Sequence, residues 1–276
     1  MNFQTRQNLN RTFSMNLSDL STQLLFTTVP LWAELPTGKS SATAFIYNAP
    51  IEGKPDQSIP LLVTNHHAVN NAKRVVVEFV ERKGDMPDTT KKLFVEVDLG
   101  QLKKYSDSKN DLAAAPIGSL LNSREAIGQP LFFRSIDPSL VPAPDVFSEL
   151  AAMEEIVFIG YPSGLRDEKN SIPLIRRGIT STPVWNDFQG SPHFLIDAGV
   201  FPGSSGSPVF ILNQGAYATK SGLSIGNRIL FLGVLSETML RQSNTEVYLG
   251  IGKVLRSDVV AQFLSNVART LAEPTN

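Results

Sequence analysis

Short apolar runs, rich in β-branched residues, recur along most of the chain, with turn-forming residues between them. Glycine, proline, asparagine or aspartate separates one run from the next, and helical periodicity is rare. Strands of about five residues with this punctuation are typical of an all-β sandwich or barrel. The clearest runs lie at residues 42–47, 61–64, 74–79, 93–97, 156–159, 177–184, 193–196, 208–212, 229–235 and 245–251.

The two ends of the chain depart from this strand pattern. Residues 1–20 are polar and lack a clear period, which indicates an N-terminal arm with a short helix over residues 15–23 capped by Ser14. Near the other end, Ser257 can cap a helix whose apolar side chains recur at helical spacing. These side chains are Val259, Val260, Phe263, Leu264 and Val267.

A cluster of prolines divides the strand-rich part of the chain. It lies between Pro116 and Pro162 and indicates a crossover near residues 116–150, with a helical turn within residues 138–153. We therefore predict an all-β fold of two β-barrels and a C-terminal helix. The predicted parts are an N-terminal arm (1–21), a first barrel (22–125), a second barrel (126–255) and a C-terminal helix and tail (256–276).

Composition excludes several classes of function. The chain has 276 residues, of which 42% are hydrophobic and 18% charged, as in an ordinary globular protein. A net charge of −1 provides no field to attract nucleic acid or anionic lipid, so we expect a protein or peptide partner. The absence of cysteine excludes disulfides, thiolate nucleophiles and cysteine-based zinc sites. We expect neither a metal nor another cofactor.

No segment predicts export or membrane insertion. The apolar stretch within the first 35 residues is broken by polar residues and Pro30, unlike the core of a signal peptide. No other stretch reaches the ~18 apolar residues of a membrane span. We therefore expect a cytoplasmic protein, although a chain without cysteine also suits the periplasm.

The sequence Gly-Ser-Ser-Gly-Ser-Pro at residues 203–208 is a candidate nucleophile segment. A serine between glycines on a tight turn presents its hydroxyl, while nearby backbone N–H groups converge on an oxyanion. Ser205 would be the nucleophile, and the N–H groups of Gly203 and Ser205 would form the oxyanion hole. Glycine- and serine-rich surface turns are also common, so the segment needs further support. The turn at residues 160–164 has no following strand and is interpreted as a loop.

A candidate base follows the apolar run at residues 61–64. The chain has three histidines, His66, His67 and His193, and the first two stand where this run ends. A general base needs an imidazole held rigidly by neighbouring structure, which a strand end provides. The Thr-x-x-His spacing favours His67 over His66. His193 lies on a predicted strand just upstream of the serine segment.

A carboxylate on the other imidazole nitrogen would fix the tautomer of the base and stabilise its cation. Asp111 precedes an apolar run and fits this role. Asp98 is a rival, and Asp107 is a weaker one. Local pattern alone leaves the choice open.

Taken together, T-N-H-H-A-V, N-D-L-A and G-S-S-G-S-P resemble the signature segments of trypsin-like serine peptidases, in the order His, Asp, Ser. The closer resemblance is to the cysteine-free bacterial Deg/HtrA-type protease domains. It extends to V-F-I-G-Y-P-S-G-L, R-R-G-I-T-S, L-G-V-L-S and Y-L-G-I-G, and spans roughly residues 38–255. The resemblance implies two six-stranded antiparallel barrels and a triad of His67, Asp111 and Ser205, which places Asp111 above Asp98.

The chain departs from this family at two points. Ala42-Thr43-Ala44-Phe45 replaces the usual Gly-x-Gly-Phe, and Ser204 stands where trypsins have aspartate and Deg-type enzymes asparagine. Without an aspartate at 204, the ion pair that a new N-terminus makes in trypsins is unavailable. We therefore expect no activation by N-terminal processing of the trypsin kind.

The resemblance also implies a primary specificity pocket. No carboxylate stands at its base, so a preference for arginine or lysine is not expected, and a small or apolar side chain is. The pocket residues would be Gly199 and Val200 at the base, with Ser236, Thr238 and Gly250 in the walls.

Rival arrangements fit less well. An α/β-hydrolase needs a histidine after the nucleophile, and none follows Ser205. A subtilisin-like order could use Asp111, His193 and Ser205, but the motifs around them do not match. We therefore predict a serine endopeptidase that acts through an acyl-enzyme. The alternative is a latent or non-enzymatic protease-fold module that needs a regulatory protein partner.

Overall fold

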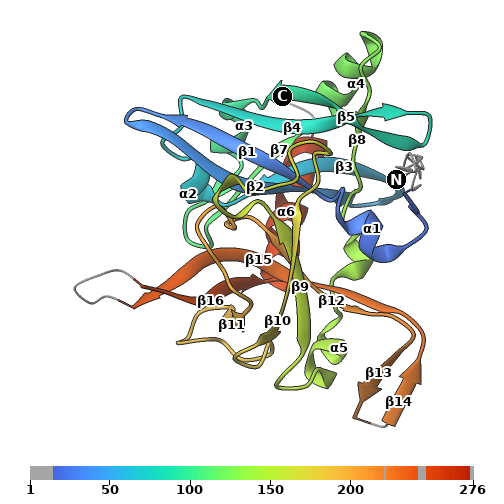
Figure 1. Cartoon of the computed structure of the whole chain (residues 1–276), viewed down its shortest axis with the longest axis vertical. Coiled ribbons are helices and arrows are strands. Elements are labelled where there is room, and N and C mark those ends of the chain that lie inside the picture. The colour runs from blue at the N-terminus through green and yellow to red at the C-terminus, as the bar shows by residue number, and fades with distance from the viewer. Residues whose placement is uncertain (1–14, 221, 242–246, 274–276) are drawn as a thin grey trace, which may run out of the picture.

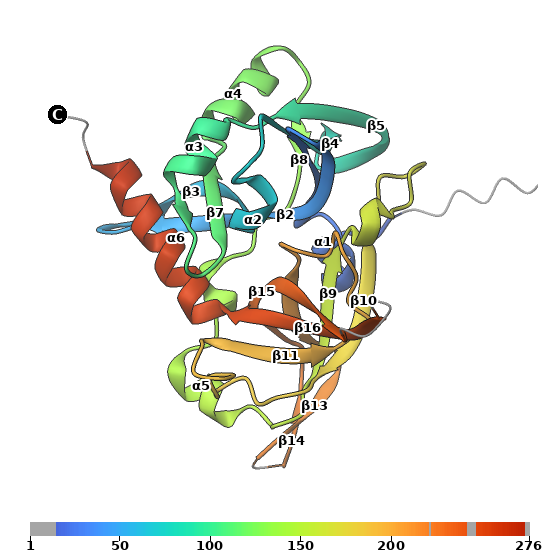
Figure 2. The same cartoon turned by 90° about the vertical axis from the view of Figure 1, so that its left-hand side faces the viewer.

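The computed structural model describes residues 15–220, 222–241 and 247–273. Two β-structures lie one above the other, the first built from the earlier half of the chain and the second from the later half (Figure 1). A helix near the C-terminal end runs along both of them (Figure 2). Among the described helices, none combines the length and apolar composition needed to cross a lipid bilayer.

The first β-structure is an antiparallel sheet of eight strands in the order β5-β4-β1-β2-β3-β7-β6, with β8 beside β4. Its strands are β1 (Thr28–Leu35), β2 (Gly38–Ile51), β3 (Lys54–Thr64), β4 (Arg74–Lys83), β5 (Met86–Glu96), β6 (Ser106–Asp107), β7 (Leu112–Pro116) and β8 (Leu131–Phe132).

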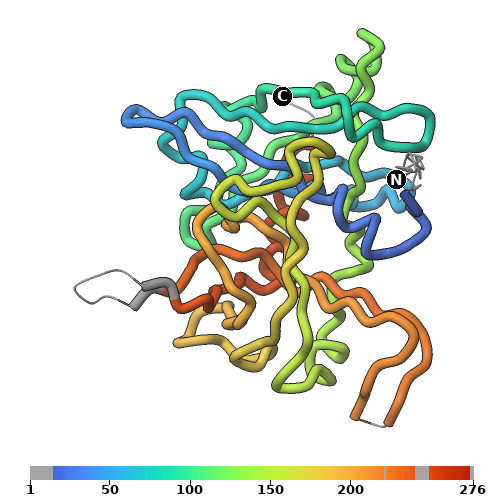
Figure 3. Tube along the Cα trace, in the orientation of Figure 1, coloured from blue at the N-terminus to red at the C-terminus, as the bar shows by residue number. Residues whose placement is uncertain are grey.

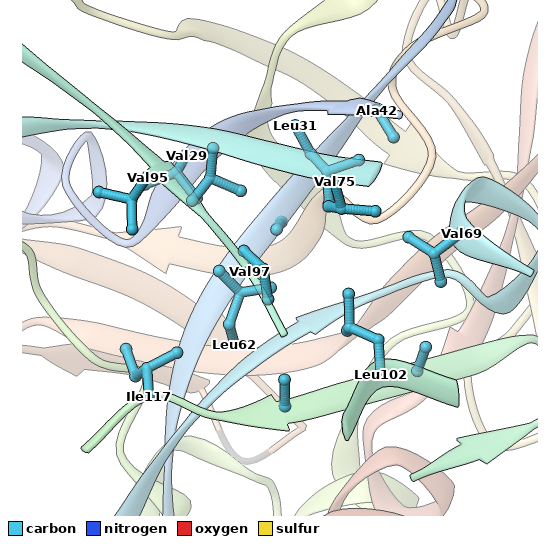
Figure 4. Close-up of a cluster of buried hydrophobic side chains, with 14 of the residues drawn as sticks. Val29, Leu31, Ala42, Leu62, Val69, Val75, Val95, Val97, Leu102 and Ile117 are labelled. Atoms are coloured by element: carbon cyan, nitrogen blue, oxygen red, sulfur yellow. The ribbon is translucent and has the colours of Figure 1, made fainter. Parts of the chain in front are cut away.

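The structure does not show the predicted closed, six-stranded first barrel, because this sheet has eight strands and no pairing in the described ranges that closes it. The edge strands β5 and β6 do not pair with each other among the described residues. Helix α3 (Leu99–Lys104) lies between them in the chain, and β6 has only two residues, too few for a long ladder. The sheet still curls around its own apolar core, which side chains such as Leu31, Leu62 and Val95 fill from several strands (Figure 4).

The second β-structure is a closed barrel in the order β10-β11-β16-β15-β12-β9. This confirms the predicted six-stranded antiparallel barrel in the later half of the chain. Its strands are β9 (Glu155–Gly160), β10 (Leu174–Thr180), β11 (His193–Asp197), β12 (Pro208–Asn213), β15 (Arg228–Arg241) and β16 (Val247–Arg256). A hairpin of β13 (Ala216–Thr219) and β14 (Gly222–Ile225) extends from the barrel between β12 and β15 (Figure 1).

A single crossover joins the two structures, as the proline cluster predicts. It leaves β8 and enters β9, and Figure 3 shows it in green between the upper and lower parts. The helical turn expected within residues 138–153 is present as two short pieces, η1 (Pro138–Leu140) and α5 (Pro144–Glu149). Helix α4 (Gly118–Ala126) precedes the crossover.

Helix α6 (Ser257–Ala272) completes an apolar joint between the sheet and the barrel. Phe45 and Leu61 of the first sheet, Phe231 of the barrel and Leu264 of α6 belong to one buried cluster. The rings of Phe45 and Phe231 lie 5.9 Å apart. Burial of such side chains is the main force that holds the two halves together.

Both predicted helix caps differ from the structure. Arg256 occupies the cap position of α6, and Ser257 is its first helical residue, with a buried hydroxyl that bonds to no described residue. The early helix, α1 (Leu20–Leu24), is capped by Asp19, which accepts a hydrogen bond from the N–H of Thr22 at 2.9 Å. Ser14, the predicted cap, lies outside the described residues.

Strand β1 is missing from the sequence prediction because Pro30 interrupts its apolar run. In the structure β1 pairs with β4 only from Leu31 to Glu34. Pro30 lies just before this stretch, so its missing N–H removes no bond to β4.

Truncation of Leu264 to alanine should lower the free energy of unfolding by about 2–5 kcal/mol, because it leaves a cavity in the joint. Urea unfolding at equilibrium measures the change. Gln262→Ala, on the exposed side of the same helix, is the control and should change stability by less than about 0.5 kcal/mol. Equal effects of the two variants would show that α6 is not part of the joint.

Candidate active site

The pairing of β3 with β7 brings His67 and Asp111 together. Thr64, the last residue of β3, lies opposite Ala113 in β7. His67 follows Thr64 by one short turn in α2 (His66–Val69), and Asp111 immediately precedes β7. Two neighbouring strand ends therefore present both side chains at one edge of the first sheet.

Asp111 holds His67 at two points. Its Oδ1 accepts a hydrogen bond from the His67 N–H at 2.9 Å, and its Oδ2 lies 2.7 Å from His67 Nδ1. The Asp111 carbonyl accepts bonds from the Asn65 side chain at 2.9 Å and from the His66 N–H at 3.1 Å. Since Nδ1 is occupied by the carboxylate, Nε2 is the ring nitrogen left to exchange a proton.

The backbone of Asp111 is strained to make these contacts. Its φ is +55°, in the left-handed region that residues other than glycine seldom adopt. Aspartate tolerates this region better than most residues, and the hydrogen bonds to residues 65–67 hold it there. Strain of this kind is frequent at functional sites.

The rival carboxylates have local roles instead. Asp98 caps α3 by accepting a bond from the Gln101 N–H at 3.1 Å. Asp107 binds the N–H groups of Lys109 and Asn110, and so shapes the turn that leads to Asp111. Neither contacts a histidine through a hydrogen bond or an ion pair in the described part of the chain.

His66 does not share the contacts of its neighbour. Its Nδ1 is buried and has no hydrogen-bond partner among the described residues. The structure thus separates two adjacent histidines into one that is bound to a carboxylate and one that is not.

The Ser205 turn lies between the barrel and the first sheet. The Gly206 N–H donates to the Leu235 carbonyl at 2.8 Å, which fixes the turn on β15. The Ser205 carbonyl accepts a bond from the Thr43 N–H at 2.9 Å, which fixes it on β2. A Cβ at Gly206 would lie 2.0 Å from the Thr43 carbonyl oxygen, so only glycine allows this approach.

Two backbone N–H groups beside Ser205 are available for a ligand. Those of Gly203 and Ser205 donate to no acceptor among the described residues. Residues 201–204 form a turn closed by the Ser204 N–H and the Phe201 carbonyl at 3.1 Å, with Gly203 at a φ of +86°. Proline followed by a glycine of positive φ is typical of a type II turn.

Ser163 sets the direction of the Gly203 N–H. The Ser163 N–H donates to the Pro202 carbonyl at 2.6 Å. The peptide between Pro202 and Gly203 is trans, so its N–H points away from its carbonyl, and therefore away from Ser163. A Cβ at Gly203 would lie 2.6 Å from the Ser163 nitrogen, so the contact also requires glycine.

The segment that carries Ser163 is anchored on the first sheet. The Tyr161 hydroxyl donates to the Thr28 carbonyl at 3.3 Å. Farther along, Arg166 pairs with the buried Glu78 at 3.0 Å and covers the ring of Trp32. The interpretation of residues 160–164 as a plain loop misses this role, because its partners come from distant parts of the chain.

Thr43 connects these parts through its side chain. Its Oγ1 donates to the Gly203 carbonyl at 3.2 Å and accepts from the Tyr161 N–H at 3.1 Å and from the Ser207 hydroxyl at 3.3 Å. Its carbonyl accepts a bond from the Thr64 hydroxyl at 2.8 Å, near His67. Thr43 is fully buried, and its hydroxyl has no capacity left.

The Ser205 hydroxyl does not bond to the His67 ring in this structure. Its only hydrogen bond among the described residues is a long one of 3.5 Å to the Ser236 carbonyl. Half of the His67 side chain is exposed to solvent. Hydrogen bonds between catalytic groups are often long before a substrate binds and shorten in the complex.

Three of the predicted pocket residues lie together. The Gly250 carbonyl accepts bonds from the N–H groups of Ala198 at 3.3 Å and Val200 at 3.1 Å. A Cβ at Gly250 would lie 3.5 Å from the Gly199 Cα. Val200 is buried in the barrel core. Thr238 pairs with Gly252, and Ser236 bonds to the Lys253 carbonyl at 3.1 Å.

His193 lies in the barrel strand β11 and makes no hydrogen bond to His67, Asp111 or Ser205 among the described residues. It is buried, and its Nδ1 has no partner among the described residues. Burial, with the charge of Lys253 as a lesser cause, lowers its pKa from 6.5 to about 4. No group of three or more histidine, aspartate or glutamate side chains in the described ranges is arranged to hold a metal ion.

The two stacked β-structures, with the His67–Asp111 pair on one and the Ser205 turn on the other, form a chymotrypsin-like fold. The chain belongs to the family of trypsin-like peptidase domains, whose family model matches residues 42–217. No curated protein matches the chain.

Solved structures with a similar fold include proteases of the HtrA type. The HtrA-type protease AlgW with a tripeptide has a TM-score of 0.51 at 16% identity, covering 90% of this chain and 62% of its own. The serine endoprotease from Yersinia pestis has a TM-score of 0.50 at 16% identity, covering 90% and 64%. This chain therefore spans under two thirds of these two proteins. The thermostable serine protease AL20 from an extremophilic microorganism has a TM-score of 0.51 at 14% identity, covering 89% and 98%.

Thr43→Val should lower the free energy of unfolding by about 2–4 kcal/mol, because it keeps the shape of the side chain but leaves the buried Tyr161 N–H and Gly203 carbonyl unpaired. Thr43→Ser keeps the hydroxyl and should cost about 1 kcal/mol for the lost methyl group. Denaturant unfolding measures both variants. A serine variant as unstable as the valine variant would show that packing, rather than the hydroxyl, is what matters.

The pH dependence of stability should contain a contribution from His193. Between pH 6.5 and about 4 the unfolded chain protonates this imidazole and the folded chain does not, so the free energy of unfolding falls as the pH drops. From pH 7 to pH 4, wild type should therefore lose about 1–3 kcal/mol more than His193→Leu, which cannot titrate. Urea unfolding of both proteins across this range tests it, and parallel pH curves would contradict it.

Proposed function

We propose that the chain is a serine endopeptidase that hydrolyses peptide bonds through an acyl-enzyme. Ser205 is the nucleophile, His67 the general base and Asp111 the carboxylate that orients it. The Gly203 and Ser205 N–H groups form the oxyanion hole, and the substrate is a protein or peptide. The observation that supports this most directly is the two-point hold of Asp111 on His67, which leaves Nε2 for the proton.

The reaction follows from these positions. The Ser205 hydroxyl oxygen attacks the scissile carbonyl carbon as its proton passes to His67 Nε2. Negative charge forms on the carbonyl oxygen, and the N–H groups of Gly203 and Ser205, which donate to no other described residue, bind it. His67 then gives the proton to the leaving amine, and the C–N bond breaks. Water repeats the attack on the ester with His67 as base, which releases the acid and restores Ser205.

The direction of the Gly203 N–H favours a competent enzyme over a latent one. In a latent turn the carbonyl of residue 202 would occupy the hole. Here that carbonyl is bound by the Ser163 N–H, on the opposite side of the peptide. The hydroxyl of Ser204, which takes the place of the trypsin aspartate, is buried and has no hydrogen-bond partner among the described residues, so Thr43 and Ser163 hold the turn instead.

Ser205→Ala should abolish hydrolysis of a casein or peptide substrate without lowering the melting temperature, because the hydroxyl makes only one long hydrogen bond. His67→Ala should lower kcat by several orders of magnitude, and His66→Ala by far less. Initial rates and thermal melts of the three variants measure these effects.

Covalent labelling with a fluorophosphonate provides an independent readout. Wild type should be labelled at Ser205, and Ser205→Ala should not be. A folded wild-type protein that neither reacts with the probe nor cleaves any peptide would contradict the proposal and support a binding module. A larger loss in His66→Ala than in His67→Ala would reassign the base.

A further inference from the structure

We propose that Arg176 places a positive charge at the base of the primary specificity pocket and selects peptides with an acidic side chain at the cleaved position. The inference rests on the proposed function and concerns its substrate class. It starts from one hydrogen bond: Arg176 Nη2 donates to the Gly199 carbonyl at 2.9 Å. Gly199 is the residue predicted to form the pocket base.

Arg176 reaches this point from the inner side of the barrel wall. It lies in β10 opposite Phe158 of β9, and opposed residues of antiparallel strands project to the same face. Phe158 is fully buried in the barrel core, so Arg176 starts on the core-facing side. Its neighbour Arg177 projects to the other face, where it is exposed and pairs with Glu155 at 2.5 Å.

The pocket base is built around the guanidinium. A Cβ at position 199 would lie 2.1 Å from Arg176 Nη2, so any side chain there would displace the charge. On its other flank, the Arg176 guanidinium carbon lies 5.7 Å from the centre of the Phe201 ring. Phe201 begins the turn that carries the Gly203 N–H, so the cation lies between the pocket base and that turn.

The charge of Arg176 is not neutralised by a carboxylate in the described ranges of the chain. A guanidinium has five N–H donors in a planar fork that matches a carboxylate, and the Gly199 carbonyl uses one of them. The predicted pocket residues Gly199, Val200, Ser236, Thr238 and Gly250 carry no charge. Glu237, which stands between Ser236 and Thr238 in the chain, lies 3.8 Å from Lys253, and the positive charge of Lys253 offsets the negative charge of Glu237. A substrate carboxylate would thus supply the missing partner.

This revises the sequence-based expectation of a small or apolar side chain. That expectation rests on the predicted pocket base, Gly199 and Val200, where no charged residue stands. Arg176 precedes Gly199 by 23 residues and reaches it through the antiparallel pairing of β10 with β11, the strand that ends two residues before Gly199.

Three quenched fluorescent peptides that differ only at the cleaved position, with Glu, Gln or Leu there, test the proposal. Glutamate and glutamine have the same shape, so their ratio of kcat/KM isolates the charge. Wild type should cleave the Glu peptide about 10- to 100-fold faster than the Gln peptide, as expected for a hydrogen-bonded charge pair. The Leu peptide should be poorer than the Glu peptide.

Variants of the two adjacent arginines make the test specific. Arg176→Gln should bring the Glu-to-Gln ratio to about one, and Arg176→Lys should keep part of it because the charge remains. Arg177→Gln is the matched control, and its ratio should equal that of wild type. Circular dichroism checks that each variant folds, and the wild-type ratio stands even if one of them does not.

The outcomes separate this inference from the proposed function. Ser205 labelling together with equal cleavage of the Glu and Gln peptides, or faster cleavage of the Leu peptide, would overturn the role of Arg176 and leave the peptidase intact. A Glu preference that survives in Arg176→Gln would overturn it as well. Wild-type protein that cleaves none of the peptides and is not labelled would end both proposals.

Discussion

The buried hydroxyl of Thr43 is the contact on which the geometry of the site depends. It binds the Tyr161 N–H in one segment of the second half of the chain, and the Gly203 carbonyl and the Ser207 hydroxyl in another. The backbone of Thr43 meanwhile belongs to the first sheet and holds the Ser205 carbonyl. Because every bond is buried and directional, a shift of one segment would leave a polar group unpaired. The two halves are therefore kept in one relative position.

This arrangement distributes the candidate active-site groups over the first sheet and the barrel. The first sheet holds His67 and Asp111 at adjacent strand ends, and the barrel holds Ser205 and the two N–H groups beside it. The buried Arg166–Glu78 ion pair and the apolar cluster that contains Phe45 and Leu264 hold the sheet and the barrel together. The His67 side chain, half of it exposed, is the group that the proposed reaction requires to accept a proton from Ser205 and to pass it to the leaving amine.

Much of this could be predicted from local pattern. The closed second barrel follows from strand length and punctuation, and the motifs around His67 and Asp111 lie at strand ends that the structure pairs. The open first sheet could not be predicted, because closure depends on whether distant edges meet. Thr43 shows only as a departure from the family pattern, since its partners lie 118 to 164 residues away. Ser163 and Arg176 act through contacts of the same long-range kind.

The position of α6 has a consequence for how the protein matures. This helix follows both β-structures in the chain, yet it fills part of the cluster that joins them (Figure 2). During synthesis the sheet and the barrel can each form before the helix emerges from the ribosome, because domains fold in the order in which they are made. The apolar cluster between them is completed only after α6 has been made and has packed against it. A nascent chain would therefore hold the sheet and the barrel, with their site residues, before the helix that packs against both of them is in place.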